Sequence, residues 1–186
     1  AFAKFSLDHN FTRPVYSRED HLRIHGGWNP ILQCIPDVST CIPNDTILDG
    51  GRRTHVIIGK GGTGKSVYLQ QVAIIVFLGH IGCYVPAKQA TIPTNIDRIC
   101  CMLSTQESLR DSSFSHGLGR ILEMLRFGSK QSLLLIESFG KGTVCSDGIA
   151  LAVSIIKRLS QKCGILMFAT HMGQLFLDQL DLTEQR

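Results

Sequence analysis

Hydrophobic residues in the second half of the chain occur in two patterns that predict different elements. Continuous apolar runs bounded by polar residues are typical of strands that are buried on both faces. Apolar residues that recur at intervals of three and four are typical of helices. The patterns predict strands over 54–58, 98–103, 132–136 and 164–169, and helices over 65–78, 114–126 and 147–159, the last with Asp147 as its N-cap. Strands that alternate with helices predict an α/β fold with a mostly parallel sheet.

The first 50 residues show no long period and hold four of the six prolines. The end of a helix is predicted before Pro14, and short strands are predicted over 21–25 and 31–35, with a turn at Asn29 and Pro30 between them. We therefore divide the chain into a small antiparallel N-terminal flank over residues 1–50 and a main domain over residues 51–186.

Composition excludes several classes of protein. With 44% hydrophobic residues and a mean hydropathy of +0.12, the chain of 186 residues is not intrinsically disordered. The seven cysteines are odd in number and none is paired at Cys-x-x-Cys spacing, which argues against a disulfide framework and a zinc ribbon and favours buried thiols in a reducing compartment. Residues 66–87 carry no charge, but Gln70, Gln71, His80 and Pro86 interrupt them, so a buried helix is favoured over a membrane span.

The strongest chemical signal is the segment from residue 59 to residue 66, which fits the phosphate-loop pattern G-x-x-x-x-G-K-[ST] in full. Its residues are Gly59, Lys60, Gly61, Gly62, Thr63, Gly64, Lys65 and Ser66. Glycines let successive backbone N–H groups point at phosphate oxygens, and the helix that follows directs its positive end at the same anion. Lys65 is expected to reach the β- and γ-phosphates of ATP, and Ser66 to bind Mg²⁺.

Two further candidates lie at the ends of predicted strands. The apolar run 132–136 leads directly into Glu137, where an acidic partner for Mg²⁺ is expected. The residue that follows is Ser138, which cannot act as a carboxylate base. The second strand, 164–169, is followed by Thr170 and His171, and a histidine there is suited to sensing a γ-phosphate or positioning a water molecule.

Taken together, these motifs resemble the ATPase domain of the MutS family, which is related to ABC-type ATPases. The resemblance covers most of the chain, through residues 27–30, 42–46, 59–66, 68–72, 81–87, 112–114, 134–148 and 169–171. It implies a P-loop NTPase fold, the cofactors ATP and Mg²⁺, and a longer parent protein in which other parts grip DNA. On this reading residues 1–50 hold the end of a lever helix and small strands, and the core over 51–186 is C-terminally truncated.

Within the family, the segment 139–143, Phe-Gly-Lys-Gly-Thr, resembles the meiotic subfamily called MutS homologue five. Members of that subfamily pair with MutS homologue four and clamp branched recombination intermediates to promote crossovers. The resemblance therefore implies a heterodimer in the nucleus, and it leaves a mismatch-recognition role open.

The resemblance also assigns roles by position. Residues 59–66 would hold ATP, Ser112 would complete the partner's ATP site, His171 would be the switch histidine and Asp147 would lie in a loop that faces the partner. Two positions depart from the family pattern. The family's Asp-Glu pair is replaced by Glu137 and Ser138, which predicts ATP binding with slow hydrolysis, and Cys41 stands near the place where some members stack an aromatic ring on the adenine.

Two other functions stay open at this point. Lys60 and the loop after it also fit the phosphate loop of partition-type ATPases, although that family places the loop almost at the N-terminus and here 58 residues precede it. Alternatively, the loss of the Asp-Glu pair would fit a degenerate module that serves as a dimerisation scaffold. The sequence alone therefore does not decide whether the chain is an enzyme.

Overall fold

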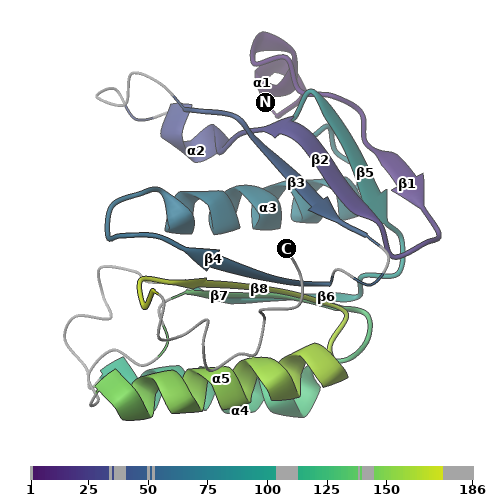
Figure 1. Cartoon of the computed structure of the whole chain (residues 1–186). Helices are drawn as coiled ribbons and strands as arrows, with labels where there is room; N and C mark the ends of the chain where they lie inside the picture. Colours follow the sequence, from purple (N-terminus) through teal and green to yellow (C-terminus); the bar gives the residue numbers. More distant parts are fainter. Residues whose placement is uncertain are drawn as a thin grey trace. The chain divides into compact units, whose positions relative to one another are not determined.

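The protein has a mixed α/β architecture that divides into two compact units (Figure 1). The computed structural model describes residues 2–33, 35, 41–49, 51, 53–103, 113–137, 139 and 145–173. Unit 1 comprises Ala1–Arg53 and Val67–Ile96, and unit 2 comprises Thr54–Ser66 and Asp97–Arg186. The division of the sequence into a flank over 1–50 and a core over 51–186 stays a prediction, because compact units and evolutionary domains need not share boundaries.

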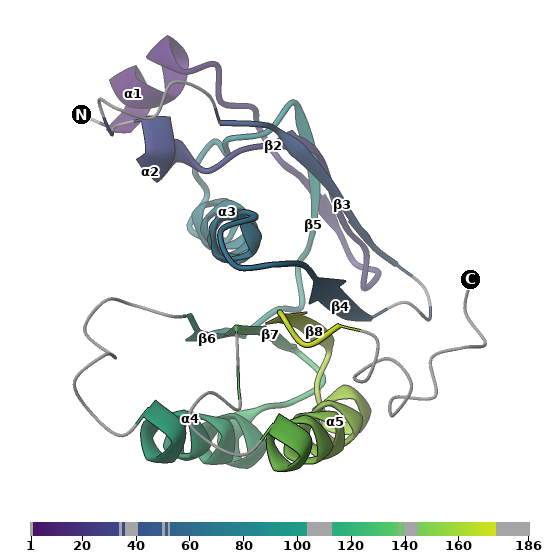
Figure 2. The same cartoon turned by 60° about the vertical axis from the view of Figure 1, so that its left-hand side comes forward.

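Unit 2 is built on a parallel sheet of four strands in the order β4-β8-β7-β6. These strands are β4 (Thr54–Ile58), β6 (Arg98–Met102), β7 (Ser132–Glu137) and β8 (Ile165–Thr170). Helices α4 (Ser113–Phe127) and α5 (Cys145–Lys162) cover one face of this sheet, with α4 on the side of β6 and α5 on the side of β8 (Figure 2). The parallel strands and their helices confirm the predicted α/β class.

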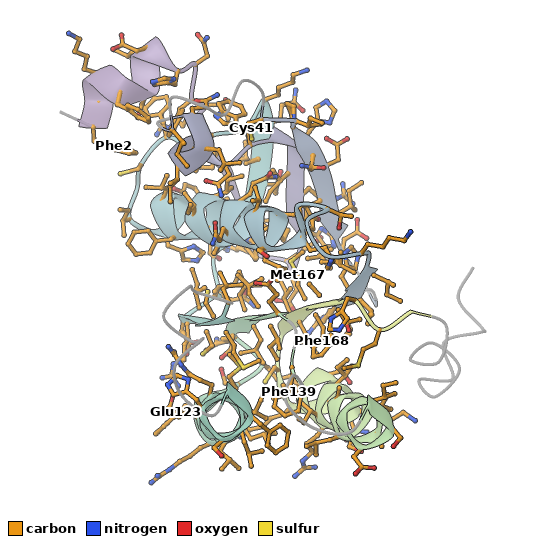
Figure 3. The ribbon with its side chains drawn as sticks, turned by 90° about the vertical axis from the view of Figure 1, so that its left-hand side faces the viewer. Phe2, Cys41, Glu123, Phe139, Met167 and Phe168 are labelled. Atoms are coloured by element: carbon orange, nitrogen blue, oxygen red, sulfur yellow. The ribbon has the colours of Figure 1, made fainter. Side chains whose placement is uncertain are left out.

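The burial of β7 and β8 in the core of unit 2 explains why the sequence pattern predicted both strands. All six residues of β7 and all six of β8 are buried, so neither strand alternates between polar and apolar positions. Phe168 and Phe139 pack with the apolar faces of α4 and α5, whereas the neighbouring Met167 lies on the opposite face of β8 (Figure 3). Burial on both faces selects apolar residues at every position of a strand.

Unit 1 contains a mixed sheet in the order β1-β5-β2-β3. Its elements are α1 (Phe2–Asp8), β1 (Val15–Ser17), β2 (Leu22–Gly27), α2 (Pro30–Gln33), β3 (Asn44–Leu48), β5 (Gln89–Pro93) and most of α3 (Lys65–His80). Strand β2 is antiparallel to β3 and β5, but β1 pairs with β5 in parallel. The prediction of a purely antiparallel flank within the first 50 residues is therefore wrong, because β5 comes from a segment distant in sequence.

Helix α3 packs against the mixed sheet through specific contacts. The Tyr16 hydroxyl donates a hydrogen bond of 2.7 Å to the Gly79 carbonyl, and a side chain at Gly79 would collide with Ile92 of β5. Near the start of the helix, the hydroxyls of Tyr68 and Thr46 are 2.8 Å apart. Since most residues of α3 are buried or half-buried, the helix matches the predicted buried helix. None of the helices in the described residues is both long and apolar enough to cross a bilayer.

Two local predictions are wrong for identifiable reasons. Residues 31–35 were expected to form a strand, but Pro30 begins helix α2 and the Asn29 side-chain oxygen accepts the Ile31 N–H at 3.0 Å. Asparagine is a preferred N-cap and proline is favoured at the first helical position, so this pair starts a helix. Asp147 was expected to cap α5, but that helix already begins at Cys145 and Asp147 lies in its first turn.

Candidate functional site

The phosphate loop, residues 59–66, forms the turn between β4 and α3, as its pattern predicts. Gly59 donates its N–H to the Thr170 carbonyl at 3.2 Å, which fixes the start of the loop to the end of β8. Gly62 and Gly64 have φ angles of 76° and 87°, a region that side chains with a Cβ rarely adopt. A Cβ built at Gly61, Gly62 or Gly64 would meet nothing within 4 Å, so no neighbouring atom crowds these three positions.

Lys65 is folded back over this turn. Its ammonium donates to the Gly59 carbonyl at 2.7 Å, to the Lys60 carbonyl at 2.6 Å and to the Thr63 hydroxyl at 3.4 Å. Thr63 in turn donates to the Lys60 carbonyl at 2.9 Å. These contacts place the Lys65 ammonium against the glycine-rich turn, and a positive charge beside such a turn is suited to an anion.

Ser66 and Glu137, both predicted as ligands for Mg²⁺, lie in direct contact. The Ser66 hydroxyl donates a short hydrogen bond to Oε1 of Glu137. Glu137 ends β7 and is 9% exposed. A hydroxyl and a carboxylate oxygen are ligand types that Mg²⁺ prefers, so the donor set fits this metal.

The strand register explains how these residues come together. Ile58 at the end of β4 pairs with Thr170, and Glu137 pairs with Ala169. The carboxyl ends of three parallel strands therefore meet at one edge of the sheet, where ligands of open α/β folds bind.

His171 directly follows β8 and is exposed. Its neighbour Thr170 is buried and shares the hydrogen bond with Gly59, so the histidine is held at the same sheet edge as the phosphate loop. The Thr170 hydroxyl accepts the N–H of Met172 at 3.1 Å, which fixes the backbone on the other side of His171.

Several predicted site residues fall outside the described part of the chain. Ser112, the predicted contact to the partner's ATP, is among them, and so are Ser138 and residues 140–143. Asp147 is described and exposed, and its carboxylate accepts a hydrogen bond of 3.3 Å from Ser146. Cys41 is half-buried and precedes β3 (Figure 3).

Sequence reasoning named Thr63 only as a member of the phosphate loop and gave Thr170 no role. Thr63 holds Lys65 and the Lys60 carbonyl, and Thr170 anchors Gly59. The position of Thr63 inside the phosphate-loop motif is the feature of the sequence that could have indicated its role. The contact of Thr170 depends on the register between β4 and β8, which no local pattern encodes.

Of the cysteines whose side chains the structure describes, Cys163 is buried, as expected, and the others are half-buried. Burial raises the pKa values of Cys100, Cys101 and Cys163, which disfavours the reactive thiolate in each case. Within the ranges that the structure describes, no group of three or more His, Cys, Asp or Glu side chains is placed to hold a metal ion.

Comparison with known proteins identifies the family. Residues 55–184 match the family described as MutS domain V. The DNA mismatch repair protein MutS of Lactobacillus delbrueckii subsp. bulgaricus is 34% identical over 186 residues, which are 98% of this chain and 21% of that protein. DNA mismatch repair protein MutS 2 of Halobacterium salinarum is 34% identical over 181 residues, covering 96% of this chain and 20% of the relative.

The chain thus spans about a fifth of the length of these relatives. The family match includes most of β4, the whole phosphate loop, Glu137 and His171, which are the elements that build the site described above. The chain belongs to the MutS family, and the matching region is its domain V.

Proposed function

We propose that this chain is the ATP-binding module of a MutS-type DNA clamp, in which the nucleotide state controls pairing with a second MutS-family subunit. The observation that carries the proposal is the Lys65 ammonium on the glycine-rich turn beside the contact between Ser66 and Glu137. The family match over residues 55–184 favours this function over a partition-type ATPase.

The residues of the site have distinct roles in this proposal. Lys65 exchanges its contacts with the loop carbonyls for the β- and γ-phosphates, while backbone N–H groups of the loop bind the remaining phosphate oxygens. Ser66 and Glu137 hold Mg²⁺, which when bound neutralises charge on the phosphates. In this proposal His171, which follows β8, senses the γ-phosphate.

Equilibrium binding of a fluorescent ATP analogue to the full-length protein tests the site. Lys65→Ala is expected to weaken binding by about 10–100-fold, because hydrogen bonds to charged groups are worth about 1.5–3 kcal/mol. Lys60→Ala is the matched control, and it is expected to change affinity by less than about threefold, as for an exposed charge. A severe effect of Lys60→Ala with a mild effect of Lys65→Ala would instead support the partition-type mechanism.

We further propose that hydrolysis is slow, because Ser138 stands where the family carries a glutamate that polarises the attacking water. Single-turnover hydrolysis by the assembled dimer tests this role. Ser138→Glu is expected to raise the rate by at least about 10-fold, since a positioned general base contributes about 10²–10⁴-fold. An unchanged rate would remove that role from position 138, and an absence of ATP binding by the native protein would favour a pure scaffold.

The finer assignment rests on the segment 139–143. We propose that the chain belongs to the meiotic subfamily of MutS homologue five, pairs with MutS homologue four in the nucleus, and contacts DNA through other parts of the protein. The relatives named above are mismatch repair proteins, so mismatch recognition is the competing role. Affinity of the purified full-length heterodimer for Holliday junctions and for mismatched duplexes separates the two roles, and the meiotic assignment predicts preference for the junction.

A further inference from the structure

Strand β6 is an edge of the parallel sheet in the part of the chain that the structure describes. It pairs with β7 along its whole length, and the sheet order places no described strand on its other side. An edge strand presents a row of backbone N–H and C=O groups that are available for pairing with another chain.

A groove of about 450 Å³ runs between this edge strand and helix α4. Its walls include Arg98, Cys100 and Cys101 from β6, and Arg120, Glu123 and Phe127 from α4. Figure 2 shows the two elements on the same side of unit 2, and Figure 3 labels Glu123 on α4. All of these residues belong to unit 2, so the groove depends on this unit alone.

One end of the groove is fixed by two contacts. Arg98 donates a hydrogen bond of 2.5 Å to the Phe127 carbonyl, which connects the start of β6 to the end of α4. The guanidinium of Arg126 lies 5.2 Å from the centre of the Phe127 ring, which is 53% exposed. An exposed aromatic ring held by a cation provides an apolar anchor point for a ligand.

The charged side chains that line the groove are those of Arg98, Arg120 and Glu123. Burial raises the pKa of Cys100, Arg98 acts against this rise, and Asp97 and then Glu123 add to it. Burial likewise raises the pKa of Cys101, and Arg120 acts against it. Along α4, Glu123 lies between Arg120 and Phe127, whose carbonyl binds Arg98, so the lining of the groove holds two arginines against one glutamate. Asp97 precedes Arg98 and is not part of this lining.

We propose that the groove between β6 and α4 is a docking site for an extended acidic peptide of a partner protein, which adds to the sheet as a strand beside β6. The side of β6 that pairs with no described strand would supply backbone hydrogen bonds, the thiols and Phe127 would contact apolar side chains, and Arg98 and Arg120 would attract carboxylates. A peptide fits better than a nucleic acid, because only a peptide has backbone N–H and C=O groups that can pair with the edge of β6. This inference is independent of ATP binding.

The test uses the full-length protein and a fluorescein-labelled peptide of alternating glutamate and valine, ten residues long. Arg120→Glu is expected to weaken its binding by at least about 10-fold, as expected for reversal of one charge in a complementary pair of surfaces. Arg158→Glu on the exposed face of α5 is the matched control and is expected to leave binding unchanged. Arg120→Gln, a smaller change, serves if the charge reversal prevents folding, and a weaker loss of about threefold is then expected.

Hydrogen exchange distinguishes strand addition from simple charge attraction. Bound peptide is expected to slow amide exchange in β6, and a peptide with N-methyl groups on alternate amides is expected to bind at least about 10-fold more weakly. Three outcomes would overturn the proposal: equal binding of the methylated peptide, equal binding to Arg120→Glu, or binding of a 20-nucleotide thymidine strand, but not the acidic peptide, through Arg120.

Discussion

The two sheets of this protein differ in how their strands are buried. In β7 and β8 of the parallel sheet every residue is buried, whereas buried and exposed residues alternate over 22–25 of β2 and 45–48 of β3 in the mixed sheet. Leu48, for example, is buried and the neighbouring Ile47 is 55% exposed. Parallel strands covered on both faces need apolar residues throughout, and mixed sheets with one exposed face do not. The site residues Glu137 and His171 are held by the fully buried strands, which gives the phosphate loop rigid neighbours.

The largest expected effect comes from truncating adjacent residues in each sheet. In β8, Met167→Ala and Phe168→Ala should each lower the free energy of unfolding by about 3 kcal/mol, because both side chains are fully buried. In β3, Leu48→Ala should cost a similar amount, but Ile47→Ala should cost less than about 0.5 kcal/mol. Chemical denaturation measures the free energy of unfolding of all four variants. Equal losses for Ile47→Ala and Leu48→Ala would contradict the claim that β3 has one buried and one exposed face.

A smaller effect is expected in the turn that joins β4 to α3. Gly64→Ala should cost about 1–2 kcal/mol, because the φ angle of 87° is unfavourable for alanine even though space is open. Gly61→Ala is the matched control, since Gly61 has open space and no positive φ, and it should be nearly neutral. Thermal melts of both variants measure the difference, and equal losses would mean that strain is not what selects glycine at position 64.

In unit 1, the start of α2 depends on Asn29. Asn29→Ala should lower stability by about 1 kcal/mol, because the side chain caps the Ile31 N–H and also donates to the Gln70 side chain at 3.3 Å. Asn44→Ala, which removes only an exposed contact to the Ile42 carbonyl, should have less than half of this effect. If urea denaturation gave the two variants the same loss, the cap would not explain why residues 31–33 are helical.

The smallest expected effect is the pH-dependent contribution of Asp45, in β3 of the mixed sheet, to the stability of the protein. The Gly26 N–H, and then the His25 side chain, hold the pKa of Asp45 below its ordinary value of 3.8. A carboxylate with a lowered folded pKa stabilises the protein above its unfolded pKa, and this contribution is lost as the pH falls through the folded pKa. The Asp45→Asn variant should therefore lose less stability than the native protein as the pH falls below about 5. Identical pH profiles of the free energy of unfolding for the two proteins would contradict this role of Asp45.

The sequence predicted unit 2 better than unit 1 for the same physical reason. Residues 132–136 and 164–169 were recognised as strands because burial on both faces leaves a continuous apolar run. Strands β1, β3 and β5 gave no such run, and β1 finds its partner β5 more than 70 residues along the chain. Pairing at that separation depends on tertiary packing, which local patterns do not record.

In the candidate site, too, local motifs predicted some features, and others depend on the folded structure. The phosphate loop, Glu137 and His171 were named from local motifs, and the structure brings the ends of their strands to one sheet edge. The folded-back position of Lys65 and the anchor from Thr170 to Gly59 could not be named, because they depend on loop conformation and on strand register. Ser112 and Ser138 stay predictions, since both lie outside the described residues.

The most direct test of the account is the Mg²⁺ dependence of ATP affinity. The native full-length protein should bind ATP more tightly when Mg²⁺ is added. Ser66→Ala and Glu137→Gln should each remove most of that gain while keeping the affinity for ATP alone within about threefold, because the proposal assigns both residues to the metal and not to the phosphates. A gain from Mg²⁺ that is unchanged in both variants would contradict the proposed metal site, and ATP binding that survives Lys65→Ala unchanged would contradict the proposed nucleotide site.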